Sequence, residues 1–290
     1  MKHTENDTTV VVGSCTATCI AKTGPVYTFE LVYPRVIHGE FLTHRMFSRN
    51  AMSSRATPAM VLIGDVLEHP YIPKYILGNK AGMVGEDTLT DEKKQLFLEE
   101  YNHLIGYVCQ KAMDMNKLGV HKNLINRIIE PFSFIKVVVT ATDWDNFFNL
   151  RSAPDAEPNM QDLAQAIRRS MDIAEDLAFK NESPMYEDCD YCNYTYYHLP
   201  YIREDELSQD TLKLMMVSAA RCARVSYLTH DGKVPTFEED LKLFFRLSEG
   251  GHYSPMEHPC VVSYHTDGHR YYNLDGAKSL RYILCENLED

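Results

Sequence analysis

The sequence predicts a single mixed α/β domain. Segments rich in β-branched and aromatic residues, which favour strands, alternate with segments whose apolar residues recur at helical spacing. The chain of 290 residues contains no internal repeat, low-complexity tract or clear linker that would divide it. A chain of this length can bury a substantial core, so we expect a flexible tail over residues 1–9 and one domain over residues 10–290.

The individual elements follow from composition and from the residues at their ends. Val26–Tyr33 and Phe132–Thr142 have the composition of strands, and Pro34 both ends the first strand and suits the first turn of a helix. Gly119 suits the C-cap of a long helix. In that helix we expect four apolar residues to face inward: Leu96, Leu104, Ile105 and Val108. We expect helices over residues 35–47, 91–118, 120–129, 143–151, 160–179, 208–224 and 236–249, a short strand and a helix within 260–290, and irregular structure over 64–90 and 183–203.

The composition argues against two classes of function. A net charge of −12 is unfavourable for wrapping duplex DNA, which depends on Lys and Arg contacts to phosphates. No apolar run approaches the roughly 18 residues that a membrane span needs. The polar N-terminus lacks the apolar core of a secretion signal. We therefore expect a cytoplasmic protein that binds neither nucleic acid nor membranes.

Eight cysteines are scattered along the chain. Cys189 and Cys192 have the Cys-x-x-Cys spacing of metal ligands, and Cys15 and Cys19 form a looser pair. No paired histidines or second tight pair accompany them. Reduced cysteines without a metal are therefore the simpler interpretation, and a zinc site is the alternative.

Residues 43–55, Thr-His-Arg-Met-Phe-Ser-Arg-Asn-Ala-Met-Ser-Ser-Arg, form a cationic segment. The segment holds three arginines, one histidine and no acidic residue. Arginine offers forked donors that match phosphate oxygens, and serine and asparagine add short neutral donors. No glycine occurs between residues 40 and 63, which excludes a P-loop or a dinucleotide fingerprint here. The segment thus predicts a site in which side chains bind a phosphorylated ligand; a solvated basic loop is the alternative.

The same segment resembles the signature of flavin-dependent thymidylate synthases, which reads Arg-His-Arg, seven residues and Ser. His44-Arg45 and Ser53 occupy matching positions. Asn50 and Arg55 also match residues that the family has beside its signature.

Two further stretches extend the resemblance towards the middle of the chain. Gly119-Val120, Arg127 and Pro131 are similar to a Gly-Val, Arg and Pro helix of the family, with one residue inserted. Asn146-Phe-Phe-Asn-Leu-Arg151 is similar to the family's Asn-Phe-Leu-x-Leu-Arg segment. In the family, the two arginines of these stretches help to bind deoxyuridylate.

Two motifs resemble the family but stand in a different order. Ala223-Arg-Val-Ser-Tyr227 and Gly251-His-Tyr-Ser-Pro-Met-Glu-His258 are similar to motifs that lie near the N-terminus in the family. The resemblance therefore implies that this chain is circularly permuted. Permutation is feasible when the original termini lie close together on the surface.

The resemblance implies a fold and a reaction. The fold would be a central, mostly antiparallel sheet flanked by helices, with active sites assembled between subunits of a homotetramer. FAD, reduced by NADPH, would deliver a hydride, and methylenetetrahydrofolate would supply one carbon to C5 of dUMP, giving dTMP. The folate and dUMP, or a related pyrimidine nucleotide, are the expected partners.

The resemblance also implies roles for individual residues. Arg151 would stabilise charge developing on the pyrimidine, which makes it a catalytic candidate. Ser53 is the second candidate, but no base partners it in the sequence, so we assign it a binding role. His252 would lie nearest the isoalloxazine and the folate; for His252 and His258 a structural role is the alternative. The nucleotide-binding candidates are Ser53, Ser54, Arg55, Arg127 and Arg151, and the flavin-binding candidates are His44, Arg45, Asn50, Asn146, Ser226, His252, Ser254 and Glu257.

Several positions depart from the family pattern. Thr43 replaces the first arginine of the signature, Glu40 stands where glutamine is frequent, and Ala51 replaces a glutamate. Thr140 and Thr142 replace an asparagine and an arginine that help to hold flavin. Losing an arginine at a bidentate site is not a conservative change. Two alternatives therefore stay open: a dUMP or dCMP hydroxymethylase on the same scaffold, and a non-catalytic nucleotide- or flavin-binding protein.

Overall fold

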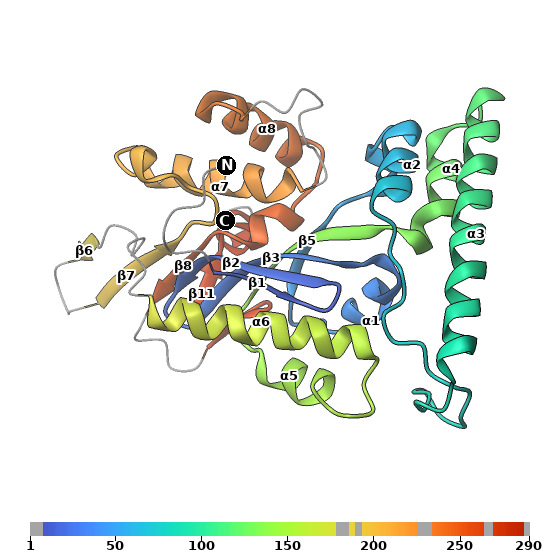
Figure 1. The fold of residues 1–290 in the computed structure, drawn as a ribbon. Coiled ribbons are helices and arrows are strands. Elements are labelled where there is room, and N and C mark those ends of the chain that lie inside the picture. The colour runs from blue at the N-terminus through green and yellow to red at the C-terminus, as the bar shows by residue number, and fades with distance from the viewer. Residues whose placement is uncertain (1–7, 178–185, 189–192, 226–233, 264–268, 287–290) are drawn as a thin grey trace.

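A five-stranded antiparallel sheet forms the centre of the computed structural model (Figure 1). The structure describes residues 8–177, 186–188, 193–225, 234–263 and 269–286. The strands are β1 (Thr9–Val12), β2 (Cys15–Thr23), β3 (Val26–Pro34), β4 (Ser48–Ala51) and β5 (Phe134–Ala141), in the spatial order β1-β2-β3-β5-β4. Within the described ranges, no helix combines the length and apolar character that a membrane span requires.

The two strands predicted from composition pair with each other in the middle of this sheet. β3 and β5 are antiparallel, with Tyr27 opposite Ala141 and Pro34 opposite Phe134. Most side chains of both strands are buried on either face of the sheet. This two-sided burial explains the nearly continuous apolar runs that identified them in the sequence.

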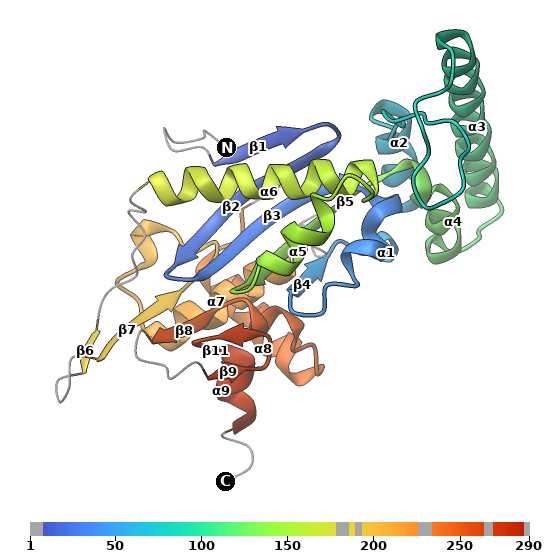
Figure 2. The same cartoon turned by 90° about the horizontal axis from the view of Figure 1, so that it is seen from below.

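Two helices cover one face of the sheet. Figure 2 shows α6 (Pro158–Asp176) lying across β1, β2 and β3, with α5 (Asp145–Arg151) beside it. Pro158 occupies the first turn of α6, and the Glu157 side chain caps it by accepting a hydrogen bond from the amide of Met160 at 2.8 Å. The main core lies between these helices and the sheet.

A second antiparallel sheet packs beside the first, in the order β11-β8-β7-β6. Val26 of β3 is buried in a cluster with Cys260, Val262, Leu274 and Ala277, so the two sheets share apolar contacts. Helices α7 and α8 pack on each other and, with α9, form a further core. The elements of this part are β6 (Tyr186–Asp188), β7 (Asn193–His198), β8 (Cys260–Ser263), β9 (Arg270–Tyr271), β10 (Leu274–Asp275), β11 (Ala277–Ser279), α7 (Thr211–Ala223), α8 (Phe237–Glu249) and α9 (Leu280–Glu286).

Three helices form a separate group beside the sheet (Figure 1). They are α2 (Ala59–Glu68), α3 (Asp91–Lys117) and α4 (Lys122–Ile129). Gly119 has φ of +80° after α3, and its amide donates to the Asn116 carbonyl. The predicted C-cap is therefore confirmed.

The predicted helix over residues 35–47 is wrong beyond its first turns. A 3₁₀ turn (Arg35–Ile37) and the short α1 (His38–Phe41) are followed by turns and then by β4. The chain reverses here so that β4 can pair with the edge of β5, with Ser48 opposite Thr140. Long-range pairing thus outweighs the local helical pattern.

Other boundaries also differ from the prediction. Thr8 is buried and Thr9 begins β1, so the predicted tail is too long at its end, and β2 was not assigned from the sequence. The ranges expected to be irregular contain the end of α2 and the strands β6 and β7. In α3, Ile105 is buried and Val108 packs on the core, but Leu96 and Leu104 are exposed. The predicted inward-facing residues of α3 therefore cover a wider part of the helix surface than the face that packs against α2 and α4.

Candidate functional site

The cationic segment folds as a turn, an edge strand and a 3₁₀ turn (Ser54–Ala56) rather than as a loop. Arg49 is half-buried and donates to the carbonyl oxygens of His44, at 2.6 Å, and Leu42, at 3.3 Å. It therefore closes the turn before β4. The antiparallel pairing of β4 with β5 then fixes the position of Asn50, opposite Val138.

A cleft of about 400 Å³ lies beside the end of this segment. One wall comes from residues 50–56 and the opposite wall from α8 and the segment that follows it, while residues at the start of α4 complete the lining. The Nδ2 atom of Asn50 lies 3.4 Å from the Ser254 Oγ, although the two residues are 204 positions apart. The fold thus brings together two motifs that are distant in the chain. The lining residues are Asn50, Ser53, Arg55, Ala56, His121, Asn123, Leu247, His252, Ser254 and Pro255.

The lining of the cleft suits an anionic ligand. Among the described residues, it contains one arginine, two histidines, two serines and two asparagines, and no carboxylate. Arg55 is exposed, so its guanidinium is accessible to a ligand. In a chain with net charge −12, a cleft without carboxylates is a local departure from the overall charge. Forked and short donors of this kind match phosphate oxygens.

Two polar lining residues, His121 and Asn123, were not predicted from the sequence. The His121 side chain caps α4 by accepting from the Asn123 amide at 3.3 Å, and its Nδ1 lies 2.9 Å from the Asn123 Oδ1. Both lie within three residues after Gly119-Val120, a pair that is part of the resemblance. A histidine at the start of a helix was the available signal.

Arg151 belongs to a second cluster, whose members do not line the cleft. Its Nη1 donates to the Glu40 Oε2 at 3.0 Å, and its Nε donates to the His44 Nε2 at 2.9 Å. Its Nη2 donates to the Thr43 Oγ1 at 3.1 Å and to the Glu40 carbonyl at 3.4 Å. Within the chain, the guanidinium is therefore held by four acceptors.

His44 is neutral in this arrangement. Burial, and then the charges of Arg151 and Arg49, lower its pKa to about 4. Because Nε2 accepts from Arg151, the ring proton must be on Nδ1. The ring packs edge-on against Phe147, with a centroid distance of 4.9 Å. His44 therefore orients Arg151 and has little free surface of its own.

The remaining candidates are dispersed. Ser54 is buried, and its carbonyl accepts from the Asn126 side chain at 2.7 Å. Glu257 is paired with Arg281. Ser226 lies outside the described residues. Three candidates are exposed and line neither the cleft nor the Arg151 cluster: Arg45, Arg127 and Asn146.

The cysteines in the described part of the chain have packing roles. The Cys15 thiol donates to the Asn159 carbonyl at 3.3 Å, and burial raises the pKa of Cys19 to about 12. Cys189 and Cys192 lie outside the described residues. Among the residues that are described, no group of three or more His, Cys, Asp or Glu could hold a metal ion.

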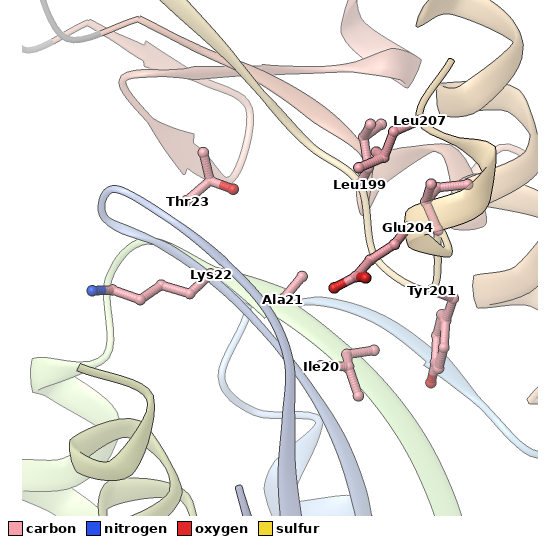
Figure 3. Close-up of a pocket in the computed structure, with 9 residues that line it drawn as sticks. Ile20, Ala21, Lys22, Thr23, Leu199, Tyr201, Glu204 and Leu207 are labelled. Atoms are coloured by element: carbon pink, nitrogen blue, oxygen red, sulfur yellow. The ribbon is translucent and has the colours of Figure 1, made fainter. Parts of the chain in front are cut away.

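A second, smaller cavity lies between β2 and the segment after β7 (Figure 3). Its volume is about 70 Å³, which leaves room for water molecules. Figure 3 shows Glu204 reaching towards Ala21, whereas Lys22 points away. Thr23 also lines this cavity.

The comparison with protein-family models agrees with the resemblance. A family model described as thymidylate synthase complementing protein matches residues 24–173. Among solved structures, a UMP/dUMP methylase, PolB, from Streptomyces cacaoi, bound with 5-Br UMP, is similar with a TM-score of 0.41 and 13% identity. That likeness covers 50% of this chain and 67% of the other. A search of curated proteins found no match.

Proposed function

Since the chain belongs to the thymidylate synthase complementing protein family, which modifies dUMP, we propose that it transfers a one-carbon unit to C5 of dUMP, giving dTMP. Methylenetetrahydrofolate would supply the carbon, FAD would be the cofactor and NADPH would be the reductant. The observation that supports this best is the carboxylate-free cleft. Most of its lining comes from the two motifs that resemble the family's flavin and nucleotide segments, residues 43–55 and 251–258.

The cleft fits a phosphate-bearing group. Ser53 and Arg55 would hold the nucleotide, since they offer a short hydroxyl and a permanent charge at one end of the cleft. His252 and Ser254 would hold the flavin from the opposite wall, together with Asn50 on the same wall as Ser53. When bound, the reduced flavin supplies hydride; the chain's own residues bind, orient and exclude water.

Arg151 would act on the pyrimidine from its cluster with His44 and Glu40. The neutral His44 orients the guanidinium through its Nε2 atom and adds no charge of its own, while Glu40 is the ion-pair partner of Arg151. A positive group held at the pyrimidine carbonyl stabilises the charge that develops as C5 becomes nucleophilic.

We further propose a homotetramer. In it, the cleft of one subunit and the exposed flavin- or nucleotide-binding candidates of a neighbouring subunit would together form one site. The candidates of this kind are Arg45, Arg127 and Asn146.

A hydroxymethylase is the second candidate function, because two of the positions that depart from the family pattern lie at Arg151. Thr43 and Glu40 both contact its guanidinium. In a hydroxymethylase, water would capture the methylene group in place of hydride. Product mass separates the two reactions, since the hydroxymethyl product carries one oxygen more than the methyl product.

The first experiment is an absorbance spectrum of the pure protein loaded with FAD, followed by bleaching with NADPH with and without dUMP. We expect a bound flavin that NADPH bleaches and a product with the mass of dTMP. The oxygen-containing product would establish the hydroxymethylase. A protein that cannot be loaded with flavin would overturn both enzyme proposals and leave a nucleotide-binding protein.

A further inference from the structure

A continuous chain of hydrogen-bonded side chains crosses the interior from the ligand cleft to the second cavity. It passes from β4 through the end of the 251–258 segment, then through β5 and β3, and on to β7 and β2. No single sequence motif contains it. In order from the cleft, its members are Asn50, His258, Thr140, Thr28, His198 and Thr23.

The first links join the cleft to the centre of the sheet. The Nε2 atom of His258 lies 3.0 Å from the Asn50 Oδ1, and its Nδ1 lies 2.8 Å from the Thr140 Oγ1. The hydroxyl oxygens of Thr140 and Thr28 are 2.6 Å apart, because these residues stand opposite each other in the β3–β5 register.

The remaining links reach the second cavity. The Thr28 Oγ1 lies 2.6 Å from the His198 Nε2, and the His198 Nδ1 lies 3.1 Å from the Thr23 Oγ1. Thr23 lines the small cavity shown in Figure 3. The far end of the chain can therefore exchange hydrogen bonds with water.

The inner members of the chain have no contact with solvent. His258, Thr140, Thr28 and His198 are each 0% exposed. Burial lowers the pKa of both histidines to about 3, so both rings are neutral. A neutral imidazole has one donor and one acceptor nitrogen, and a hydroxyl donates one proton. Each histidine must therefore donate to one neighbour and accept from the other, and so must each threonine whose proton is used within the chain.

Only two complete arrangements satisfy this condition. In one, every proton points towards the cleft, both histidines carry the proton on Nε2, and the Asn50 oxygen accepts from His258. In the other, every proton points towards Thr23, both histidines carry it on Nδ1, and the Asn50 amide is rotated so that its NH₂ group donates to the His258 Nε2 at 3.0 Å. The rotated NH₂ group also meets the carbonyls of Arg49 and Ser254.

We infer that this buried chain positions Asn50: its direction decides whether the cleft is offered the oxygen or the NH₂ group of that amide. The inference rests on the proposed function only in taking the cleft as the ligand site. His258, Thr140, Thr28 and His198 are positioning residues, since none of them lines the cleft. Thr140 departs from the family's asparagine, and in this chain it acts on the ligand through His258 and Asn50.

The test reads the tautomer of His198, which is four hydrogen bonds away from Asn50. Asn50→Asp supplies a group that only accepts, so it forces every proton towards the cleft and places the His198 proton on Nε2. Adding Thr140→Val breaks the chain without changing side-chain size. The Thr28 hydroxyl then has only His198 as an acceptor, and the His198 proton moves to Nδ1. Nitrogen-15 NMR of labelled histidines measures this, in alkaline buffer so that His258 stays neutral beside the new carboxylate.

The matched control is Thr140→Ser, which keeps the hydroxyl. We expect Asn50→Asp with Thr140→Ser to match Asn50→Asp alone, and Asn50→Asp with Thr140→Val to show the opposite His198 tautomer. The same tautomer in all three proteins would overturn the inference. If Thr140→Val does not fold, Thr28→Val breaks the chain at the next link and is expected to move the His198 proton to Nδ1 as well.

A FAD titration of the single variants tests the effect on the cleft. We expect Thr140→Val to bind FAD several-fold more weakly than the wild type, and Thr140→Ser to bind it equally well. Equal binding by all three proteins would show that the chain does not position Asn50 for a ligand. If no protein binds FAD, the proposed function fails, while the tautomer measurements still decide the inference about the chain.

Discussion

The buried carboxylate of Asp240 offers a quantitative test of how α7 and α8 are held together. Asp240 is 0% exposed and accepts from the Arg221 Nε at 2.8 Å and from the Arg224 Nε at 2.6 Å. Arg221 also donates to both oxygens of Glu206. Asp240→Asn would remove the charge and turn one NH₂ group towards a guanidinium. Removing one partner of a buried ion pair costs about 3–5 kcal/mol.

We expect Asp240→Asn to lower the free energy of unfolding by about 3 kcal/mol, the lower end of that range, because Arg221 keeps its pairing with Glu206. Urea denaturation followed by circular dichroism measures the change. The matched control is Asp205→Asn: the side chain of Asp205 is 82% exposed and lies 3.9 Å from Arg203. The control should cost less than about 0.5 kcal/mol. Equal losses for the two variants would refute the view that this network stabilises the α7–α8 pair.

Three further predictions concern the site and the same network. Arg55→Ala should weaken dUMP binding about tenfold or more and leave FAD affinity unchanged; a change in FAD affinity alone would mean that the phosphate is assigned wrongly. Arg151→Ala should lower kcat by about 10²–10³-fold with an unchanged circular dichroism spectrum, and near-normal turnover would refute its role. Burial raises the pKa of Glu206, but hydrogen bonds from Arg221 and Arg203 outweigh it and hold the pKa at about 2, below the ordinary 4.5. A carboxyl with a lowered folded-state pKa stabilises the protein above its unfolded pKa, and this contribution disappears as pH falls from 4.5 towards 2. Glu206→Gln should therefore be less stable at neutral pH and lose less stability over that acid range; an unchanged slope would contradict the assignment.

The parts of the fold that the sequence predicted are those determined locally. β3 and β5 are buried on both faces, so their composition alone identifies them. The end of α3 follows from Gly119, whose positive φ suits glycine. Residues 42–51 could not be predicted in the same way, because their conformation depends on pairing with β5, which lies about ninety residues further along.

The candidate site was predictable in composition but not in arrangement. The cationic segment is visible in the sequence, and Asn50, Ser53 and Arg55 do line a cleft. The contact of Asn50 with Ser254 is a tertiary contact that no local pattern contains. The sequence also gave no reason to separate Arg151 from this cleft, because the bond from Arg151 to Glu40 depends on how α5 packs beside α1.

The departures at residues 40 and 43 are mutually consistent in this structure. An arginine at position 43 could only donate, and it would bring a second cation against Arg151. Thr43 instead accepts from Arg151, and Glu40 adds a carboxylate where glutamine would be neutral. Together they give Arg151 acceptors within the chain, whereas the described residues that line the cleft with Arg55 include no carboxylate. Any difference in chemistry between this chain and its family should therefore arise at Arg151 and the pyrimidine, whereas phosphate binding in the cleft should be shared.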